Sequence, residues 1–161
     1  MSLTLQIPSQ AHLPSFRAAL AEYHAERRHL GLDAGGLPDY IAGLADRIAN
    51  PKPGRVPETF LWGVLIGEYV GRVSLRHELN AGLEIWGGHI DYEVRLSMRG
   101  RNLLAGVLPH AHTLGLERVL LHCYKSNAAS TCIIEKAGGM LEGLVVNPDG
   151  EVGRRYRMEL A

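Results

Sequence analysis

The chain has few cysteines, no excess of charge of either sign and no long apolar run. Its two cysteines, Cys123 and Cys132, share no metal-binding or redox spacing, so we expect reduced thiols and a cytoplasmic protein. Lys and Arg together number 17, as do Asp and Glu. This balance argues against a dedicated nucleic-acid-binding protein, which usually carries a basic excess. Gly and charged residues break the apolar runs, so no membrane span is expected. Residues 1–15 also lack the basic start and apolar core of a secretory signal.

The pattern of elements describes one α/β domain over residues 1–161. This length is enough for a single domain with its own core. Hydrophobic periodicity and Gly, Pro and capping signals predict strands at 3–7, 59–66, 69–75, 89–96, 118–124, 140–146 and 151–158, and helices at 15–29, 38–49, 102–114 and 127–137. This order predicts a mixed, mostly antiparallel sheet flanked by helices on both faces. A turn is expected at 80–82, and Pro109 is expected to kink the helix that contains it.

Residues 87–139 form the stretch on which the functional reading depends. A predicted strand runs into a basic turn at 97–101, and a helix, a strand and a second helix follow. The first turn of a helix has unpaired N–H groups and the positive end of the helix dipole. Arg99 and Arg101 add positive charge at that point. The combination favours binding of a phosphate or pyrophosphate.

The same stretch resembles the GCN5-related N-acetyltransferases, and more narrowly an acetyltransferase-like subgroup of them. The matching residues are GGHIDY at 87–92, RGRNLL at 99–104, Asn127, Ser130 and IEKAGG at 134–139, with RHELN at 76–80 upstream. The resemblance is strongest from residue 70 to residue 142. It implies the acyl-CoA N-acyltransferase fold, acetyl-CoA as cosubstrate, and transfer of an acetyl group to a primary amine of a small acceptor.

The resemblance also implies which residues hold acetyl-CoA. The backbone of Glu93, Val94 and Arg95, where the fourth strand splays from the fifth, would pair with the pantetheine arm. The pyrophosphate would lie on the turn and on the helix start formed by Arg99, Gly100, Arg101, Asn102, Leu103 and Leu104. Asn127 and Ser130 match positions on the last helix. Asn127 would contact the pantetheine arm, and its alternative role is that of a helix cap.

Three positions depart from the family pattern. Asn102 stands where a small residue, usually Gly, is expected, and Leu104 stands where Gly or Ala is expected. These two changes predict weaker binding of acetyl-CoA, because glycine lets backbone N–H groups approach phosphate closely. Ile134 replaces the tyrosine that many members use as general acid. Tyr124 is a candidate substitute, and a structural role is its alternative.

Proton removal from the amine needs a base, and one strand offers candidates. His89, Asp91 and Glu93 share a face by the two-residue alternation of a strand. We expect Glu93 or His89 to deprotonate the amine, directly or through water. His110 and His112 lie two apart on a helix and do not face each other, so no metal site is expected.

Two hypotheses of different classes follow. The first is an acetyl-CoA-dependent N-acetyltransferase acting on a small-molecule amine. The alternative is a non-catalytic domain of the same fold that binds CoA weakly or not at all and acts by interaction. Neither nucleic acid nor membrane is expected as a partner, and the oligomeric state is open, with a homodimer among the options.

Overall fold

A computed structural model describes residues 2–161. The strands are β1 (Thr4–Gln6), β2 (Glu58–Leu65), β3 (Glu68–Arg76), β4 (Ile90–Val94), β5 (Arg118–Tyr124), β6 (Met140–Val146) and β7 (Val152–Glu159). The α-helices are α1 (Leu13–Ala25), α2 (Leu37–Ala49), α3 (Ala81–Ile85), α4 (Leu103–Thr113) and α5 (Ala128–Lys136), and short 3-10 turns occupy Gln10–His12 and Leu96–Met98. The order of strands and long helices is the one that the sequence predicts.

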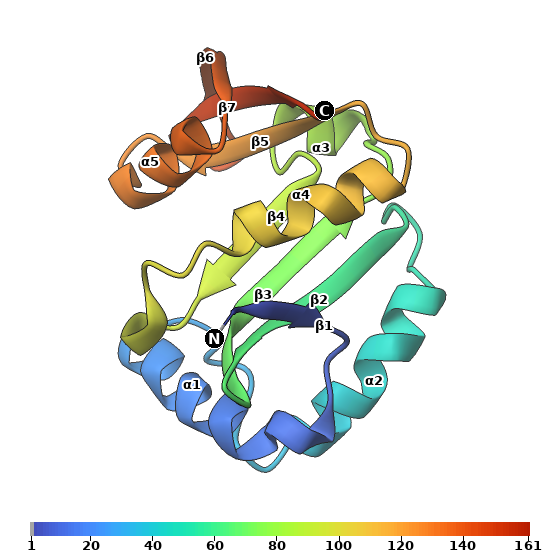
Figure 1. Cartoon of the computed structure of the whole chain (residues 1–161), viewed down its shortest axis with the longest axis vertical. Helices are drawn as coiled ribbons and strands as arrows, with labels where there is room; N and C mark the ends of the chain where they lie inside the picture. The colour runs from blue at the N-terminus through green and yellow to red at the C-terminus, as the bar shows by residue number, and fades with distance from the viewer. Residues whose placement is uncertain (1) are drawn as a thin grey trace.

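The strands form two sheets, as Figure 1 shows, where the sequence predicts one. The first has the order β1-β2-β3-β4 and the second the order β5-β7-β6, and every ladder in them is antiparallel. Between β4 and β5 only an isolated bridge forms, from Gly88 to Leu121. The two strands diverge from that bridge, so the predicted sheet is divided at this point.

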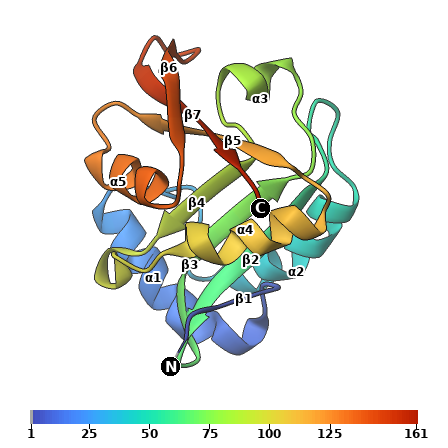
Figure 2. The same ribbon diagram turned by 45° about the horizontal axis from the view of Figure 1, so that its top comes forward.

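Helices cover both faces of the first sheet, which confirms the layered arrangement (Figure 2). On one face α1 and α2 pack over an aromatic core that includes Phe16, Tyr23, Trp62 and Tyr69. On the other face α4 packs over an aliphatic core that continues into the second sheet and α5. The first sheet is therefore held between two cores, and the position of β4 is fixed from both sides.

One element differs from the sequence expectation of a turn at 80–82. Residues 81–85 form the short helix α3, and the Asn80 side chain caps it by accepting the Leu83 N–H at 3.0 Å. The asparagine read as a turn residue is a helix N-cap, and the two roles use the same side-chain acceptor. Pro109 lies inside α4, as expected.

Within residues 2–161, no helix combines the length and the hydropathy that crossing a membrane requires. Both cysteines are free thiols, Cys123 buried and Cys132 exposed. No group of three or more metal-ligating side chains occurs in the same described range.

Candidate functional site

The largest cavity along the divergence of β4 and β5 has a volume of about 490 Å³. Five segments line it: Arg28 after α1, Arg72 of β3, residues 91–94 of β4, residues 99–101 of the turn after β4, and the start of α5 with its N-cap, namely Asn127, Ala129, Ser130 and Ile133. We call it the β4–β5 cavity. It brings together residues that the sequence had assigned to cofactor binding and to catalysis.

The basic turn forms one end of the β4–β5 cavity. Arg99, Gly100 and Arg101 line it and are exposed, and Arg99 also pairs with Glu26 at the end of α1. Gly100 has φ +91°, which a residue with a side chain rarely adopts, so the left-handed position of this turn is residue 100. Asn102 has φ −88°, and no unusual dihedral is required of it.

The other three predicted turn residues serve the start of α4. The Asn102 side chain accepts the Ala105 N–H at 3.0 Å and so acts as the N-cap. Leu103 and Leu104 are buried in the core, at 1 % and 0 % exposure. Leu104 therefore points away from the cavity and leaves its volume unreduced. Any contact of these two leucines with a ligand would have to use the backbone.

The free edge of β4 presents backbone groups to the β4–β5 cavity. The bonds Arg76 N–H to His89 O, at 2.7 Å, and Arg95 N–H to Val70 O, at 2.9 Å, fix the phase of the β3–β4 ladder. By antiparallel alternation Glu93 and Arg95 bond to β3, while Tyr92 and Val94 direct N–H and C=O outward. The backbone groups available to an extended ligand are thus those of Tyr92 and Val94. This corrects the expectation for Glu93 and Arg95.

The Arg95 side chain has a structural role. It is 6 % exposed and bonds to Glu22 of α1 at 2.9 Å, with further contacts to the carbonyls of Ser15 and Tyr69. Burial would raise the pKa of Glu22, but the bonds from Arg95 and from Ser97 outweigh burial and lower that pKa to about 2. This ion pair ties α1 to the end of β4.

The α5 side of the β4–β5 cavity carries two of the predicted residues. Asn127 and Ser130 both line the cavity, and the Asn127 side chain also accepts the Ser130 N–H at 3.0 Å as the cap of α5. The Ser130 hydroxyl bonds to the Tyr92 hydroxyl at 2.7 Å. Burial raises the pKa of Tyr92, although the bond to Ser130 opposes this, so the phenol is neutral near pH 7. Ile134 is fully buried.

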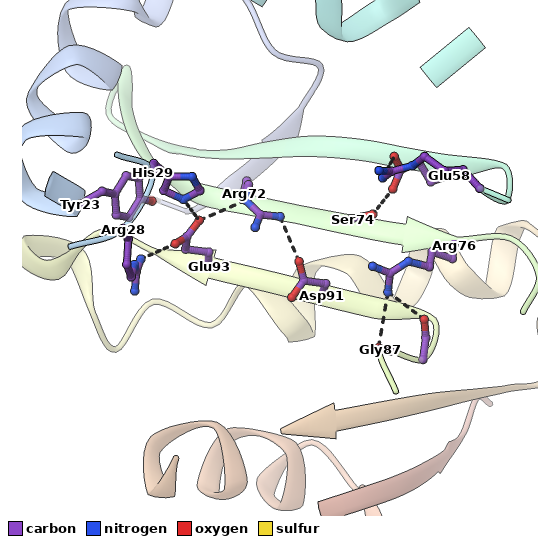
Figure 3. A network of polar contacts seen from close by, with 12 residues as sticks. Tyr23, Arg28, His29, Glu58, Arg72, Ser74, Arg76, Gly87, Asp91 and Glu93 are labelled. Atoms are coloured by element: carbon purple, nitrogen blue, oxygen red, sulfur yellow. Dashed lines mark hydrogen bonds and ion pairs between the residues drawn. The ribbon is translucent and has the colours of Figure 1, made fainter. Parts of the chain in front are cut away.

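Glu93 lies at the centre of a cluster of cationic and polar groups, drawn in Figure 3. Its carboxylate contacts His29 Nε2 at 2.8 Å and Arg72 Nε at 3.1 Å, and it pairs with Arg28 through the other oxygen. Burial alone would raise the pKa of Glu93, but His29, Arg72 and Arg28 together lower it. Arg72 also reaches Asp91 at 3.0 Å. A carboxylate held in this way is a weak base.

His29 is the residue that sequence reasoning missed. It follows α1 in a segment where Arg27 and His29 have φ +61° and +54°, values that non-glycine residues adopt only at some cost. Its ring packs against Tyr23, with centroids 5.0 Å apart, and its side chain is 35 % exposed. No local pattern indicates this contact, because 64 positions separate His29 from Glu93.

The structure separates His89 from Asp91 and Glu93. His89 precedes β4 and is not among the residues that line the β4–β5 cavity. Its N–H donates to Leu120 O at 2.8 Å, and its Nδ1 accepts the Leu120 N–H at 2.9 Å. Burial and the neighbouring Arg76 lower the pKa of His89. His89 therefore joins the two sheets next to the Gly88–Leu121 bridge, and the expectation of a shared face with Glu93 is corrected.

A second cavity of about 270 Å³ adjoins the first and shares Asp91, Tyr92, Asn127 and Ser130 with it. Tyr124, the candidate acid, lines this second cavity and packs on Trp86 at 5.1 Å. Trp86 also lies so close to Gly153 that a Cβ there would meet its ring at 2.2 Å. Tyr124 thus belongs to an aromatic group outside the β4–β5 cavity.

Comparisons with known proteins place the fold. No family model and no curated protein match the chain. Among solved structures, the acetyltransferase from Salmonella typhimurium that modifies the N-terminal serine of ribosomal protein L7/L12 has a TM-score of 0.69 at 15 % identity, over 100 % of this chain and 96 % of its own. The microcin C7 self-immunity acetyltransferase MccE, in complex with acetyl-CoA and AMP, has a TM-score of 0.72 at 13 % identity, over 98 % and 92 %.

A third similar structure is that of yncA, a putative acetyltransferase from Salmonella typhimurium with acetyl-CoA. Its TM-score is 0.66 at 13 % identity, over 100 % of this chain and 95 % of its own. At these identities the likeness establishes the fold, which is the GCN5-related acetyltransferase fold that the sequence predicts. It leaves activity and acceptor to be argued from the residues.

Proposed function

We propose that the chain is an acetyl-CoA-dependent N-acetyltransferase of the cytoplasm that acetylates a primary amine of a small acceptor. One observation carries the proposal. The β4–β5 cavity joins a basic turn, a free strand edge and the start of α5 in a fold whose solved examples include complexes with acetyl-CoA. Each of these three features matches one part of the cosubstrate.

The residues present fit acetyl-CoA part by part. Arg99, Arg101 and the N-terminal end of α4 suit the pyrophosphate, because they supply two positive charges and unpaired helix N–H groups. The outward N–H and C=O groups of Tyr92 and Val94 suit the amides of the pantetheine arm, as in the addition of a strand. Asn127 borders the same space from α5. When bound, acetyl-CoA would supply the acetyl group as a thioester.

The proton of the amine goes to His29 in this proposal. The contact with Glu93 holds one ring nitrogen as an N–H donor, and this leaves Nδ1 with a lone pair for the proton. Glu93 is then a positioning residue that orients the ring, an assignment in keeping with its lowered pKa. Glu93 thus contributes to catalysis through His29 and is not itself the base. His89 is left out because it bonds to Leu120.

The departing sulfur takes its proton from Tyr92. As the amine nitrogen forms the C–N bond, the C–S bond breaks and its electron pair stays on sulfur. The Tyr92 phenol is neutral, lines the cavity and is hydrogen-bonded to Ser130, so it can donate a proton to the thiolate. His29 gains one proton and Tyr92 loses one, and exchange with solvent restores both. This assignment replaces the missing helix tyrosine with one on β4.

Two measurements test the proposal. We expect acetyl-CoA to raise the melting temperature, because a ligand that binds only the folded state stabilises it. We expect a screen of small amines with thiol detection to show CoA release that depends on the acceptor. Stabilisation without turnover on any amine would favour a CoA-binding domain that acts by interaction. Absence of stabilisation at saturating acetyl-CoA would refute the proposed cofactor site.

A further inference from the structure

The second cavity, of about 270 Å³, adjoins the β4–β5 cavity and differs from it in charge. Among the described residues that line the second cavity, Asp91 is the only carboxylate, and no guanidinium or ammonium group occurs. The β4–β5 cavity has four arginines against two carboxylates: Arg28, Arg72, Arg99 and Arg101 against Asp91 and Glu93. An anionic cosubstrate is therefore favoured in the β4–β5 cavity, and a cation is favoured in the second cavity.

His122 also lines the second cavity and adds no charge to it. Burial, together with the neighbouring Arg155, lowers the pKa of His122 to about 4, so its ring is neutral near pH 7. Within residues 2–161 neither ring nitrogen has a hydrogen-bonding partner, and both are shielded from solvent. The ring packs on Trp86, with centroids 5.5 Å apart. His122 thus contributes an aromatic wall to the cavity.

Asp91 is the group that a cation in the second cavity would meet. Its side chain is 48 % exposed, and Arg72 reaches one of its two oxygens, Oδ2, at 3.0 Å. Figure 3 shows how Arg72 joins Asp91 to Glu93, which lies two residues further along the same face of β4. Asp91 and Tyr92 line both cavities. An ammonium group at Asp91 would therefore lie where the two cavities meet, beside the proposed proton donor to sulfur.

The aromatic walls of the second cavity suit a small flat ring. Tyr124 is 40 % exposed and packs on Trp86, with centroids 5.1 Å apart. Aromatic side chains stack on other rings and attract cations to their faces. The volume of about 270 Å³ is below the range of roughly 300–1,000 Å³ that holds a drug-sized ligand. This space is sized for one ring and a short chain rather than for a peptide.

We propose that the second cavity binds the acceptor, and that this acceptor is an arylalkylamine whose amino group is its only ionised group. The ammonium group pairs with Asp91, and the ring packs on Trp86 and Tyr124. A carboxylate next to the amino group, as in an amino acid, would lie close to Asp91 and lower the affinity. The role as acceptor rests on the proposed function, whereas binding of the amine in this cavity does not.

Binding can be measured without turnover. The chain has two tryptophans, so nitrogen-15 labelling gives two indole N–H signals in NMR spectra, from Trp62 in the aromatic core and from Trp86 at the second cavity. Titration with phenethylamine should shift the Trp86 signal saturably and leave the Trp62 signal in place. Hydrocinnamate has the same ring and chain with a carboxylate in place of the ammonium group, and it should bind about tenfold or more weakly. Titrations with and without CoA separate this readout from the proposed cofactor site.

Substitutions assign the contacts of the amine. Asp91→Asn keeps the shape of the side chain and removes its charge, so the dissociation constant of phenethylamine should rise about tenfold or more. Asp39→Asn, at an exposed carboxylate in the first turn of α2, is the matched control and should bind as the unmodified chain does. Tyr124→Leu removes the ring and should weaken binding more than Tyr124→Phe, which retains a ring. Melting temperatures establish that each variant is folded.

The possible outcomes distinguish this inference from the proposed function. A Trp86 signal that stays in place at every phenethylamine concentration, with and without CoA, overturns the inference. So does tight binding of hydrocinnamate, or an unchanged affinity in folded Asp91→Asn. If phenethylamine binds but releases no CoA from acetyl-CoA, the cavity is an amine site and its role as acceptor site is refuted. If phenethylamine does not bind while another amine is acetylated, the proposed function stands and the acceptor class is wrong.

Discussion

At the scale of the residue, the site depends on what surrounds Glu93. A lone carboxylate on a strand was the natural candidate for a base. Contacts with Arg28, His29 and Arg72 change its chemistry, because three donors stabilise the ionised form. The same contacts hold the His29 ring against Glu93, which itself lines the β4–β5 cavity. In the proposed mechanism Glu93, which the sequence offers as a candidate base, thus positions His29 instead.

The His29–Glu93 pair makes a prediction about kinetics. His29→Gln should lower kcat by roughly 100-fold or more, in the range of a lost general base, with little change in the KM for acetyl-CoA. Glu93→Gln retains a group that can orient the ring, so it should lower kcat less and shift the acidic limb of the pH–rate profile. His112→Gln, at an exposed position in the last turn of α4, is the control and should retain activity.

Steady-state rates over a pH range would decide between the two residues. If Glu93→Gln abolishes turnover while His29→Gln leaves the rate and its pH profile unchanged, Glu93 is itself the base and the assignment to His29 is wrong.

At the scale of the element, the residues at the start of α4 have separate structural roles. Gly100 supplies the left-handed backbone, Asn102 caps the helix and Leu104 fills the core. The departures from the family pattern at 102 and 104 therefore do not obstruct the cavity. Leu104→Ala should therefore leave the affinity for acetyl-CoA unchanged. Removing this fully buried side chain should instead cost about 2–5 kcal/mol of stability.

Asn102→Asp isolates the electrostatic role of this helix start. Asp retains the capping acceptor, so the melting temperature should stay the same or rise slightly. Its negative charge would lie where the pyrophosphate is expected, so the affinity for acetyl-CoA should fall about tenfold. Titration calorimetry measures the affinity, and thermal unfolding measures the melting temperature. Asn80→Asp, at the cap of α3, serves as the control. Unchanged affinity in Asn102→Asp would place the pyrophosphate away from α4.

At the scale of the whole molecule, the two sheets are joined at Gly88 and His89. A Cβ on Gly88 would lie 2.3 Å from the Leu120 carbonyl, and the φ of +65° at this position also favours glycine. His89 uses backbone and side chain to bond to Leu120, so it closes one end of the divergence between the strands. The open length beyond it holds the β4–β5 cavity.

The contact of His89 with Leu120 should make the free energy of unfolding depend on pH. The pKa of His89 is lowered in the folded state, so its contribution is complete above the unfolded pKa of about 6.5 and is lost as the pH falls below that value. His89→Ala should therefore lower the free energy of unfolding by about 1–2 kcal/mol at pH 8, with a smaller difference near pH 5. Urea denaturation at several pH values measures this difference.

The exposed His112 is the control, and His112→Ala should show no such trend. A His89→Ala variant with full stability at every pH and greatly reduced turnover would return His89 to the list of catalytic candidates.

The sequence by itself determined the order of elements, because periodicity and capping act between residues that are close along the chain. Val107 and Ala111 could be assigned to the core from spacing alone, and both are fully buried. The Arg99–Arg101 turn and Asn127 could likewise be placed at helix starts from local signals. These residues line one cavity because α4 and α5 both begin beside the divergence of β4 and β5.

Only the tertiary structure decided which groups face the cavity and what they contact. Register between β3 and β4 selects the backbone of Tyr92 and Val94 over that of Glu93 and Arg95, and register depends on packing across the whole sheet. The contact of Glu93 with His29 joins residues 64 positions apart, and only the packing of α1 on the first sheet brings the segment after α1 to β4. The joint between the two sheets likewise depends on His89 bonding to Leu120, a long-range contact that no local pattern encodes.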